Sequence, residues 1–86
     1  MELAFLHLKE AQRLNPYDPK INNALAVYYA QNLDRKKALD FFYRALKINP
    51  YDQDTYNNLA LFYEQSKDNA RAQTLRKQGQ GINLFN

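Results

Sequence analysis

The sequence predicts an all-α protein built from repeated antiparallel helical hairpins, and three observations support this fold class. The tetrapeptide Asn-Pro-Tyr-Asp occurs at residues 15–18 and again at 49–52, so the repeat length is 34 residues. A fixed period of this size is typical of stacked supersecondary units. Apolar residues between these segments recur at spacings of three and four, which places them on one helical face. The chain also has few β-branched residues, which disfavours strands.

The helix boundaries are marked by proline and aspartate. Pro16 and Pro50 end the helices that precede them, because the residue before proline is pushed out of the α region. An aspartate stands where each later helix begins and can accept hydrogen bonds from its free N–H groups. The predicted N-cap residues are Asp18, Asp34, Asp52 and Asp68. The predicted helices cover residues 2–14, 19–31, 35–48, a fourth that follows Asp52 and a fifth that starts near Asn69.

The fifth helix departs from the pattern of the third. Arg76 and Gly79 occupy the positions that Phe42 and Ala45 hold one period earlier. Because each glycine inside a helix costs on the order of 1 kcal/mol relative to alanine, we expect the helix to fray after Gln78. Alternatively, the apolar residues near the C-terminus fold back and cover the last hydrophobic edge. These residues are Ile82 and Phe85.

The 86 residues form one small domain, residues 1–86. The period divides it into 1–18, the second helix of a partial unit, a full unit over 19–52, and a last unit over 53–86. The apolar fraction of 45% predicts a folded chain, and the lack of cysteine excludes thiolate metal sites. The apolar runs are too short to span a membrane, and no secretory signal is visible. We therefore expect no membrane insertion and favour a cytoplasmic location.

The net charge is +3, and the basic residues cluster once, at Arg35-Lys36-Lys37. Nucleic-acid binding would need a continuous basic stripe with aromatic residues for base stacking. Asp34 and Asp40 interrupt this cluster. We interpret it as the solvated first turn of a helix and expect no nucleic-acid partner.

Helices of this length joined by short turns pack as antiparallel hairpins, and a hairpin repeated every 34 residues resembles the tetratricopeptide repeat (TPR). The resemblance implies a right-handed α-solenoid of about two and a half repeats and five helices. The sequence departs from the family pattern at Asn22, where an aromatic is frequent, and at Leu33 and Lys67, where the turns lack glycine. The matching residues are Leu25-Ala26, Tyr29, Ala38, Phe42, Ala45 and Pro50, then Tyr56, Leu59-Ala60, Tyr63 and Ala72.

We expect the functional surface on the faces of the second and fourth helices that do not enter the core. In the resembled family these faces line a concave groove that binds peptides of partner proteins. Asparagine both donates and accepts hydrogen bonds and so suits contact with a peptide backbone. The alternative is that these are ordinary polar surface residues. The predicted groove residues are Lys20, Asn23, Val27, Ala30, Asp54, Asn57, Asn58, Leu61 and Glu64.

Two further expectations concern apolar and aromatic residues. Tyr17 and Tyr51 each follow a proline, and we favour packing on the next hairpin over a role in a binding rim. Helix 2–14 resembles the second member of a hairpin whose first member is missing, and its wide apolar face invites a partner. The alternative to peptide binding is therefore a structural module that self-assembles into homo-oligomers through its terminal helices, or a piece of a longer array of such repeats. The residues predicted to mediate self-assembly are Leu3, Phe5 and Leu6.

No group of residues in the sequence indicates an enzyme. His7 is the only histidine, so it has no second histidine or cysteine with which to bind a metal. Aspartates recur at helix starts, where capping accounts for them better than acid–base chemistry does. Phosphate-loop motifs are absent, since Gly79 and Gly81 are the only glycines. We expect no catalytic residue, cofactor or metal site.

Overall fold

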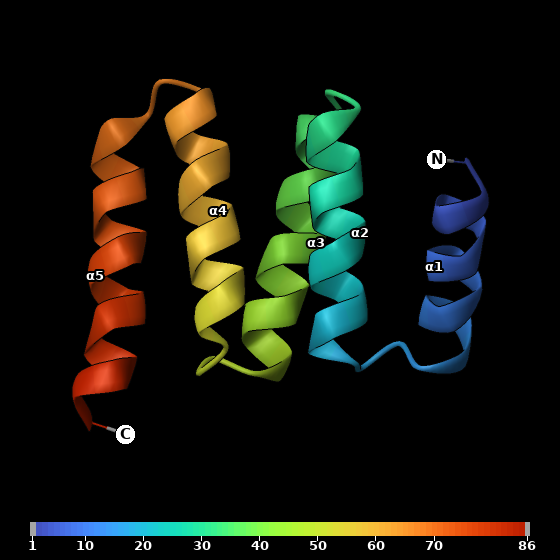
Figure 1. Cartoon of the computed structure of the whole chain (residues 1–86), viewed down its shortest axis with the longest axis horizontal. Helices are drawn as coiled ribbons and strands as arrows, with labels where there is room; N and C mark the ends of the chain where they lie inside the picture. The colour runs from blue at the N-terminus through green and yellow to red at the C-terminus, as the bar shows by residue number, and fades with distance from the viewer. Residues whose placement is uncertain (1, 86) are drawn as a thin grey trace. The chain divides into compact units, whose positions relative to one another are not determined.

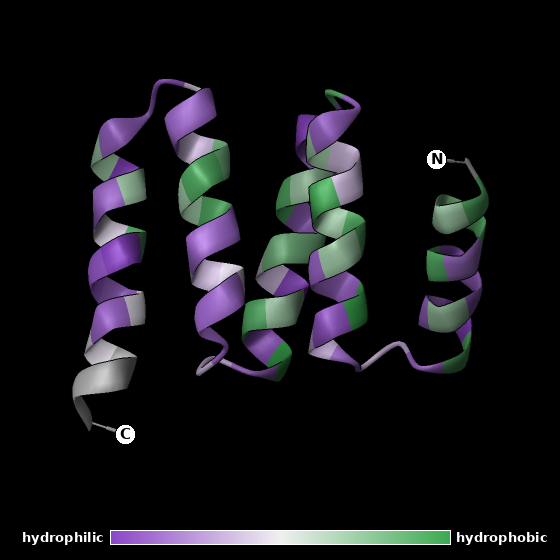
Figure 2. Cartoon of the chain, viewed as in Figure 1, coloured by the Kyte–Doolittle hydropathy of each residue, from purple (hydrophilic) through white to green (hydrophobic). Residues whose placement is uncertain are grey.

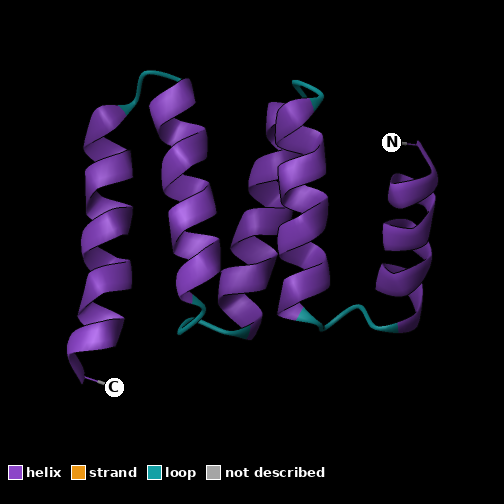
Figure 3. Cartoon of the chain, in the orientation of Figure 1, coloured by secondary structure: helices purple, strands orange, loops and turns teal. Residues whose placement is uncertain are grey.

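The structure is a computed structural model that describes the backbone of residues 2–85 and the side chains of residues 3–81. Within that range the chain forms helices and loops, with no strand (Figure 3). The helices are α1 (Glu2–Leu14), α2 (Pro19–Gln31), α3 (Arg35–Ile48), α4 (Gln53–Gln65) and α5 (Asn69–Phe85) (Figure 1). The predicted all-α fold with five helices is confirmed over these residues. The chain divides into two compact units, residues 1–50 and 51–86.

The aspartates predicted as N-caps all accept hydrogen bonds from backbone N–H groups in the first turn of the helix that follows. These bonds satisfy donors that have no partner inside the helix. Their carboxylate oxygens accept from Lys20 N at 2.9 Å (Asp18), Lys37 N at 3.2 Å (Asp34), Asp54 N at 3.2 Å (Asp52) and Arg71 N at 3.3 Å (Asp68).

Each hairpin turns at a residue with positive φ, Leu33 in the first unit (61°) and Lys67 in the second (63°). In the first turn Asp34 N donates to the carbonyl of Tyr29 at 2.9 Å, and Leu33 N donates to that of Ala30 at 3.2 Å. These are the two bonds of a Schellman motif, which usually has glycine at the left-handed position. The turns keep this geometry without glycine, so Leu33 and Lys67 each adopt a strained, left-handed backbone conformation.

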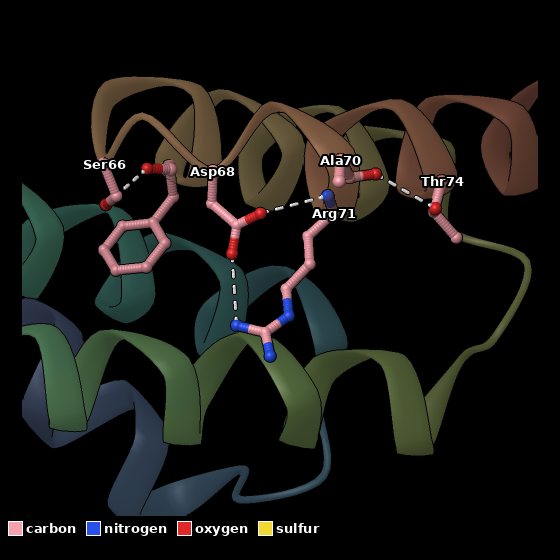
Figure 4. Close-up of polar contacts among 6 residues, drawn as sticks. Ser66, Asp68, Ala70, Arg71 and Thr74 are labelled. Atoms are coloured by element: carbon pink, nitrogen blue, oxygen red, sulfur yellow. Dashed lines mark hydrogen bonds and ion pairs between the residues drawn. The ribbon is translucent and has the colours of Figure 1, made fainter.

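The second turn is held by further local bonds (Figure 4). The hydroxyl of Ser66 donates to the carbonyl of Phe62 at 2.9 Å and so satisfies one of the last acceptors of α4. Besides capping α5, the Asp68 carboxylate accepts from the Arg71 guanidinium at 3.2 Å. The hydroxyl of Thr74 donates to the carbonyl of Ala70 at 3.1 Å. The bonds of Ser66 and Asp68 thus stabilise the reversal between α4 and α5, and the Thr74 bond lies within α5.

In the first unit, α2 packs along the length of α3, and small residues permit their close approach. The helix α1 has fewer contacts with α2, and these include ring contacts of its Phe5. Phe5 stacks on Tyr28 with ring centroids 4.3 Å apart and meets the edge of Tyr29 at 5.7 Å. Tyr29 in turn stacks on Phe41 at 5.6 Å. The fully buried core residues of this unit include Leu25, Ala26, Ala38, Phe42 and Ala45.

Asn22 is fully buried, at a position where the resembled family frequently has an aromatic residue. Its side-chain Nδ2 donates to the carbonyl of Asp18 at 2.8 Å and to that of Pro16 at 3.0 Å. Among the described residues its Oδ1 has no hydrogen-bond partner. In place of apolar packing, Asn22 therefore supplies two hydrogen bonds that hold the loop between α1 and α2; we call this pair of bonds the loop clasp.

In the second unit α4 packs against α5, and α5 continues through Gly79 and Gly81 to Phe85. The expectation that it frays after Gln78 is wrong. Gly79 is buried against α4, where a Cβ would lie 3.3 Å from the Cβ of Tyr56. Packing against α4 stabilises the helix despite its glycines and its largely hydrophilic sequence (Figure 2). The side chains of Ile82 and Phe85, predicted alternatively to cover a hydrophobic edge, lie outside those that the structure describes.

Candidate functional site

The predicted groove consists of two stripes of residues, one on each unit. The α2 stripe is Lys20, Asn23, Val27 and Ala30, at spacings of three and four along one face of the helix. Lys20 is exposed, and the other three residues are half-buried. The opposite face of α2 enters the core of its unit. The stripe therefore presents a cation, an amide and small apolar side chains to a partner.

The α4 stripe is Asp54, Asn57, Leu61 and Glu64, with Asn58 beside it. Asn58 is half-buried, and the stripe residues themselves are exposed. Leu61 keeps 48% of its surface in solvent, although Leu59 and Ala60 next to it are fully buried. This stripe is therefore an exposed apolar side chain between polar ones, on a helix held rigidly from its other side.

Glu64 is less available than the sequence suggested. The Arg76 guanidinium of α5 donates to its carboxylate through Nη2 at 2.7 Å and through Nε at 3.3 Å. This bond lowers the pKa of the Glu64 carboxyl and raises the pKa of the Arg76 guanidinium. Both side chains remain about two-fifths exposed, so the pair joins α4 to α5 at the surface. Arg76 is one period after Phe42, so the second unit has an ion pair where the first unit has a buried apolar side chain.

The apolar face of α1 differs in part from the prediction. Leu3 and Leu6 are 70% and 60% exposed. Phe5, which was predicted with them, is instead half-buried in the stack on Tyr28. Leu14 follows Leu3 by three helical turns, lies on the same side and is 67% exposed. The exposed apolar face of α1 therefore consists of Leu3, Leu6 and Leu14.

The tyrosines that follow the prolines point into solvent. Tyr17 is 81% exposed and Tyr51 is 69% exposed, so the expectation that they pack on the next hairpin is wrong. In the first loop the physical reason is visible. Asn22 holds the carbonyls on both sides of Tyr17, and the ring is left outside.

A cleft of about 560 Å³ lies beside this exposed ring, within the first unit. Sequence reasoning missed it, because its lining comes from the end of α1, the loop after it and the end of α3. The available signal was charge, since residues 35–48 hold five Lys and Arg against one Asp. We call it the α3 cleft; it is lined by Gln12, Pro16, Tyr17, Arg44, Lys47 and Ile48.

The described residues contain neither a metal-binding cluster nor a membrane-spanning helix. Among the described residues, no three or more histidine, aspartate or glutamate side chains are grouped so that they could hold a metal ion. In the same part of the chain, no helix combines the length and apolar character that a membrane span requires. His7 is exposed on α1.

Residues 41–80 match the family model of the tetratricopeptide repeat. The chain carries a tetratricopeptide repeat over these residues. The matched segment covers most of α3, all of α4 and α5 as far as Gln80. A search of curated proteins gave no significant match.

Tetratricopeptide repeats are in general protein–protein interaction modules and are typically not catalytic. The repeat assignment explains the paired features of the two units. Leu33 and Lys67 are one period apart and share the same left-handed turn. Asp18 and Asp52 share the same cap, and each begins the first helix of a hairpin. The repeat differs between its copies at Asn22 and Tyr56, and at Phe42 and Arg76.

Proposed function

We propose that this chain binds a peptide segment of a partner protein through the α2 stripe and the α4 stripe. The family supports a role in protein–protein interaction in general. The first helix of each hairpin supports the finer proposal, because one face is anchored in a core and the other carries amides at helical spacing. Rigid presentation of this kind lowers the ordering cost of binding.

The observation that carries the proposal is Leu61. A half-exposed leucine flanked by Asn57 and Glu64 offers an apolar contact beside hydrogen-bonding groups. Each net hydrogen bond contributes about 1 kcal/mol, so a few such bonds with a small apolar contact give micromolar affinity. Lys20 opposes Asp54 in charge, and Glu64 is neutralised by Arg76. Binding is therefore expected to depend weakly on salt.

The test is the double change Asn57→Ala and Leu61→Ala, followed by recovery of partner proteins on the immobilised chain. Both side chains are exposed, so the helical content should stay unchanged. The matched control is Gln73→Ala with Lys77→Ala, two exposed residues of α5 outside the stripe. Partner recovery should fall with the first pair and persist with the second. Equal recovery with both pairs would exclude the α4 stripe.

We further propose that the module is not catalytic. The aspartates that could act as acids or bases are bound to backbone N–H groups at helix starts. His7 is isolated on the surface of α1 and has no metal-ligand group around it in the described part of the chain.

A second candidate function is self-assembly, which the exposed leucines of α1 favour. Removing Leu3, Leu6 and Leu14 from water on both copies would supply a driving force at about 25 cal/mol per Å² of apolar area. We expect Leu3→Glu with Leu6→Glu to give monomers in sedimentation velocity. Phe5 is not used in this test, because its replacement would also undo the packing of α1 on α2. If the unaltered chain is monomeric across a wide concentration range, this candidate is excluded.

A further inference from the structure

The α3 cleft shares no residue with the α2 and α4 stripes. Part of its lining is apolar and consists of Pro16, the exposed ring of Tyr17 and Ile48. Its volume of about 560 Å³ falls in the range of sites that hold a compact ligand or a few side chains. The cleft therefore has room and apolar surface for one or two side chains of another molecule.

The lining of the cleft also includes two cations. Arg44 and Lys47 stand one turn apart on α3, and none of the described residues that line the cleft is acidic. Arg44 is held in place by Asp40 at 3.3 Å and by the Phe41 ring, whose centroid is 5.1 Å from the guanidinium carbon. A guanidinium has five N–H donors, and one carboxylate cannot accept from all of them, so Arg44 can also donate to a ligand. The cleft thus combines a fixed guanidinium with a second positive charge.

The net positive charge of the chain is concentrated on α3, the helix that supplies Arg44 and Lys47 to the cleft. Residues 35–48 have five Lys and Arg and one Asp, whereas residues 51–86 have four of each sign. An anionic segment approaching the molecule is therefore attracted to α3 rather than to the second unit.

We propose that the α3 cleft binds an acidic segment of a partner protein that carries an apolar side chain beside its carboxylates. The carboxylates contact Arg44 and Lys47, and the apolar side chain packs on Tyr17, Pro16 and Ile48. A nucleic acid fits less well, because it needs several stacking rings along a continuous cationic track. The cleft offers one ring, and Asp40 separates its cations from the lysines at the start of α3. The partner surface is thus distinct from the stripes of the proposed function.

The test uses a fluorescein-labelled, C-terminally amidated peptide in which glutamates flank one leucine and one phenylalanine. Amidation leaves side-chain carboxylates as its only anionic groups apart from the dye. Fluorescence anisotropy should show binding that weakens as salt rises and is lost when the glutamates are replaced by glutamine. Lys47→Glu should raise Kd about tenfold, and Tyr17→Ser should raise it several-fold.

The matched control is Lys77→Glu, which changes net charge equally at an exposed position of α5. It should leave Kd nearly unchanged. Because Glu is unfavourable at a helix C-terminus, Lys47→Gln provides a milder variant if Lys47→Glu reduces helicity. Equal weakening by Lys77→Glu and Lys47→Glu would show attraction to net charge alone and overturn the proposal. It would also be overturned if an oligouridine or phosphatidylserine vesicles bound in place of the peptide with the same dependence on Lys47 and Tyr17.

Discussion

The two glycines of α5 lie two residues apart but face different surroundings, and replacing each by alanine tests the packing of the second unit. At Gly81 an added Cβ meets no atom within 4 Å. The substitution then only raises helix propensity and lowers the entropy of the unfolded chain, which stabilises by about 0.5–1 kcal/mol. We expect Gly81→Ala to stabilise the protein.

At Gly79 an added Cβ would lie 3.3 Å from the Cβ of Tyr56 and 3.8 Å from the Cγ of Gln53. The optimum carbon–carbon separation is about 3.5–4.0 Å. The Cβ of Tyr56 is bonded directly to the backbone of α4, so a rotamer change cannot move it away. The two helices must separate slightly, and overpacking of this kind costs about 1–3 kcal/mol. After the propensity gain is deducted, we expect Gly79→Ala to destabilise by about 0.5–2 kcal/mol.

The assay is urea unfolding followed by far-UV circular dichroism, with thermal unfolding as a second measurement. A change of 1 kcal/mol moves the midpoint temperature of a domain this small by about 4–8 °C. The two variants should therefore shift it in opposite directions. Amide hydrogen exchange in α5 would localise the effect to the second unit. If Gly79→Ala stabilises as much as Gly81→Ala, the close approach of α4 and α5 at this point is incorrect.

Three further predictions concern the turns, the loop clasp and the ion pair. Leu33→Gly and Lys67→Gly should each stabilise by about 0.5–1 kcal/mol in urea unfolding, because glycine relieves the left-handed strain; Leu33→Ala, which keeps that strain, should not. Asn22→Ala should destabilise by about 1–3 kcal/mol, since two loop carbonyls lose their buried donor, and an unchanged midpoint would refute the clasp. The carboxyl of Glu64 has its pKa lowered in the folded protein, so its pair with Arg76 stabilises above the ordinary glutamate pKa and loses this effect as pH falls through the lowered value. Thermal unfolding should therefore show Glu64→Gln less stable than the unaltered chain at neutral pH, and the difference should shrink in acid.

The sequence predicted the features that depend on local chemistry. The caps at Asp18 and Asp34 need only a carboxylate beside the first turn of a helix, so composition and spacing were sufficient. The turns at Leu33 and Lys67 were also located, because the 34-residue period aligns them. The start of α5 followed from Asp68 in the same way.

The features that sequence reasoning missed depend on distances between segments. Fraying after Gln78 was predicted from the intrinsic cost of glycine, but Gly79 permits the close contact with α4 that offsets this cost. Phe5 was assigned to the apolar face of α1, but a stack on Tyr28 cannot be inferred from periodicity alone.

The candidate surfaces were predicted to different extents. The stripe residues Asn57 and Leu61 were placed by helical spacing; both are exposed, and their role in binding stays a prediction. The pairing of Glu64 with Arg76 was missed, because the two residues are 12 positions apart on different helices. The α3 cleft was missed for a similar reason. Lys47 lines it together with the loop before α2, and the sequence alone does not bring those segments together.

The limited contact of α1 with α2, which includes the stack of Phe5 on Tyr28, affects how copies of the chain could exchange segments. A helix held by few contacts opens with a smaller free energy than the hairpin beneath it. Opening separates the Phe5 ring from Tyr28 and exposes both. A second chain in the same open state presents the same two rings, so the stack can re-form between chains with no new type of contact. The amount of any dimer formed by such exchange would be set by protein concentration and by the free energy of opening.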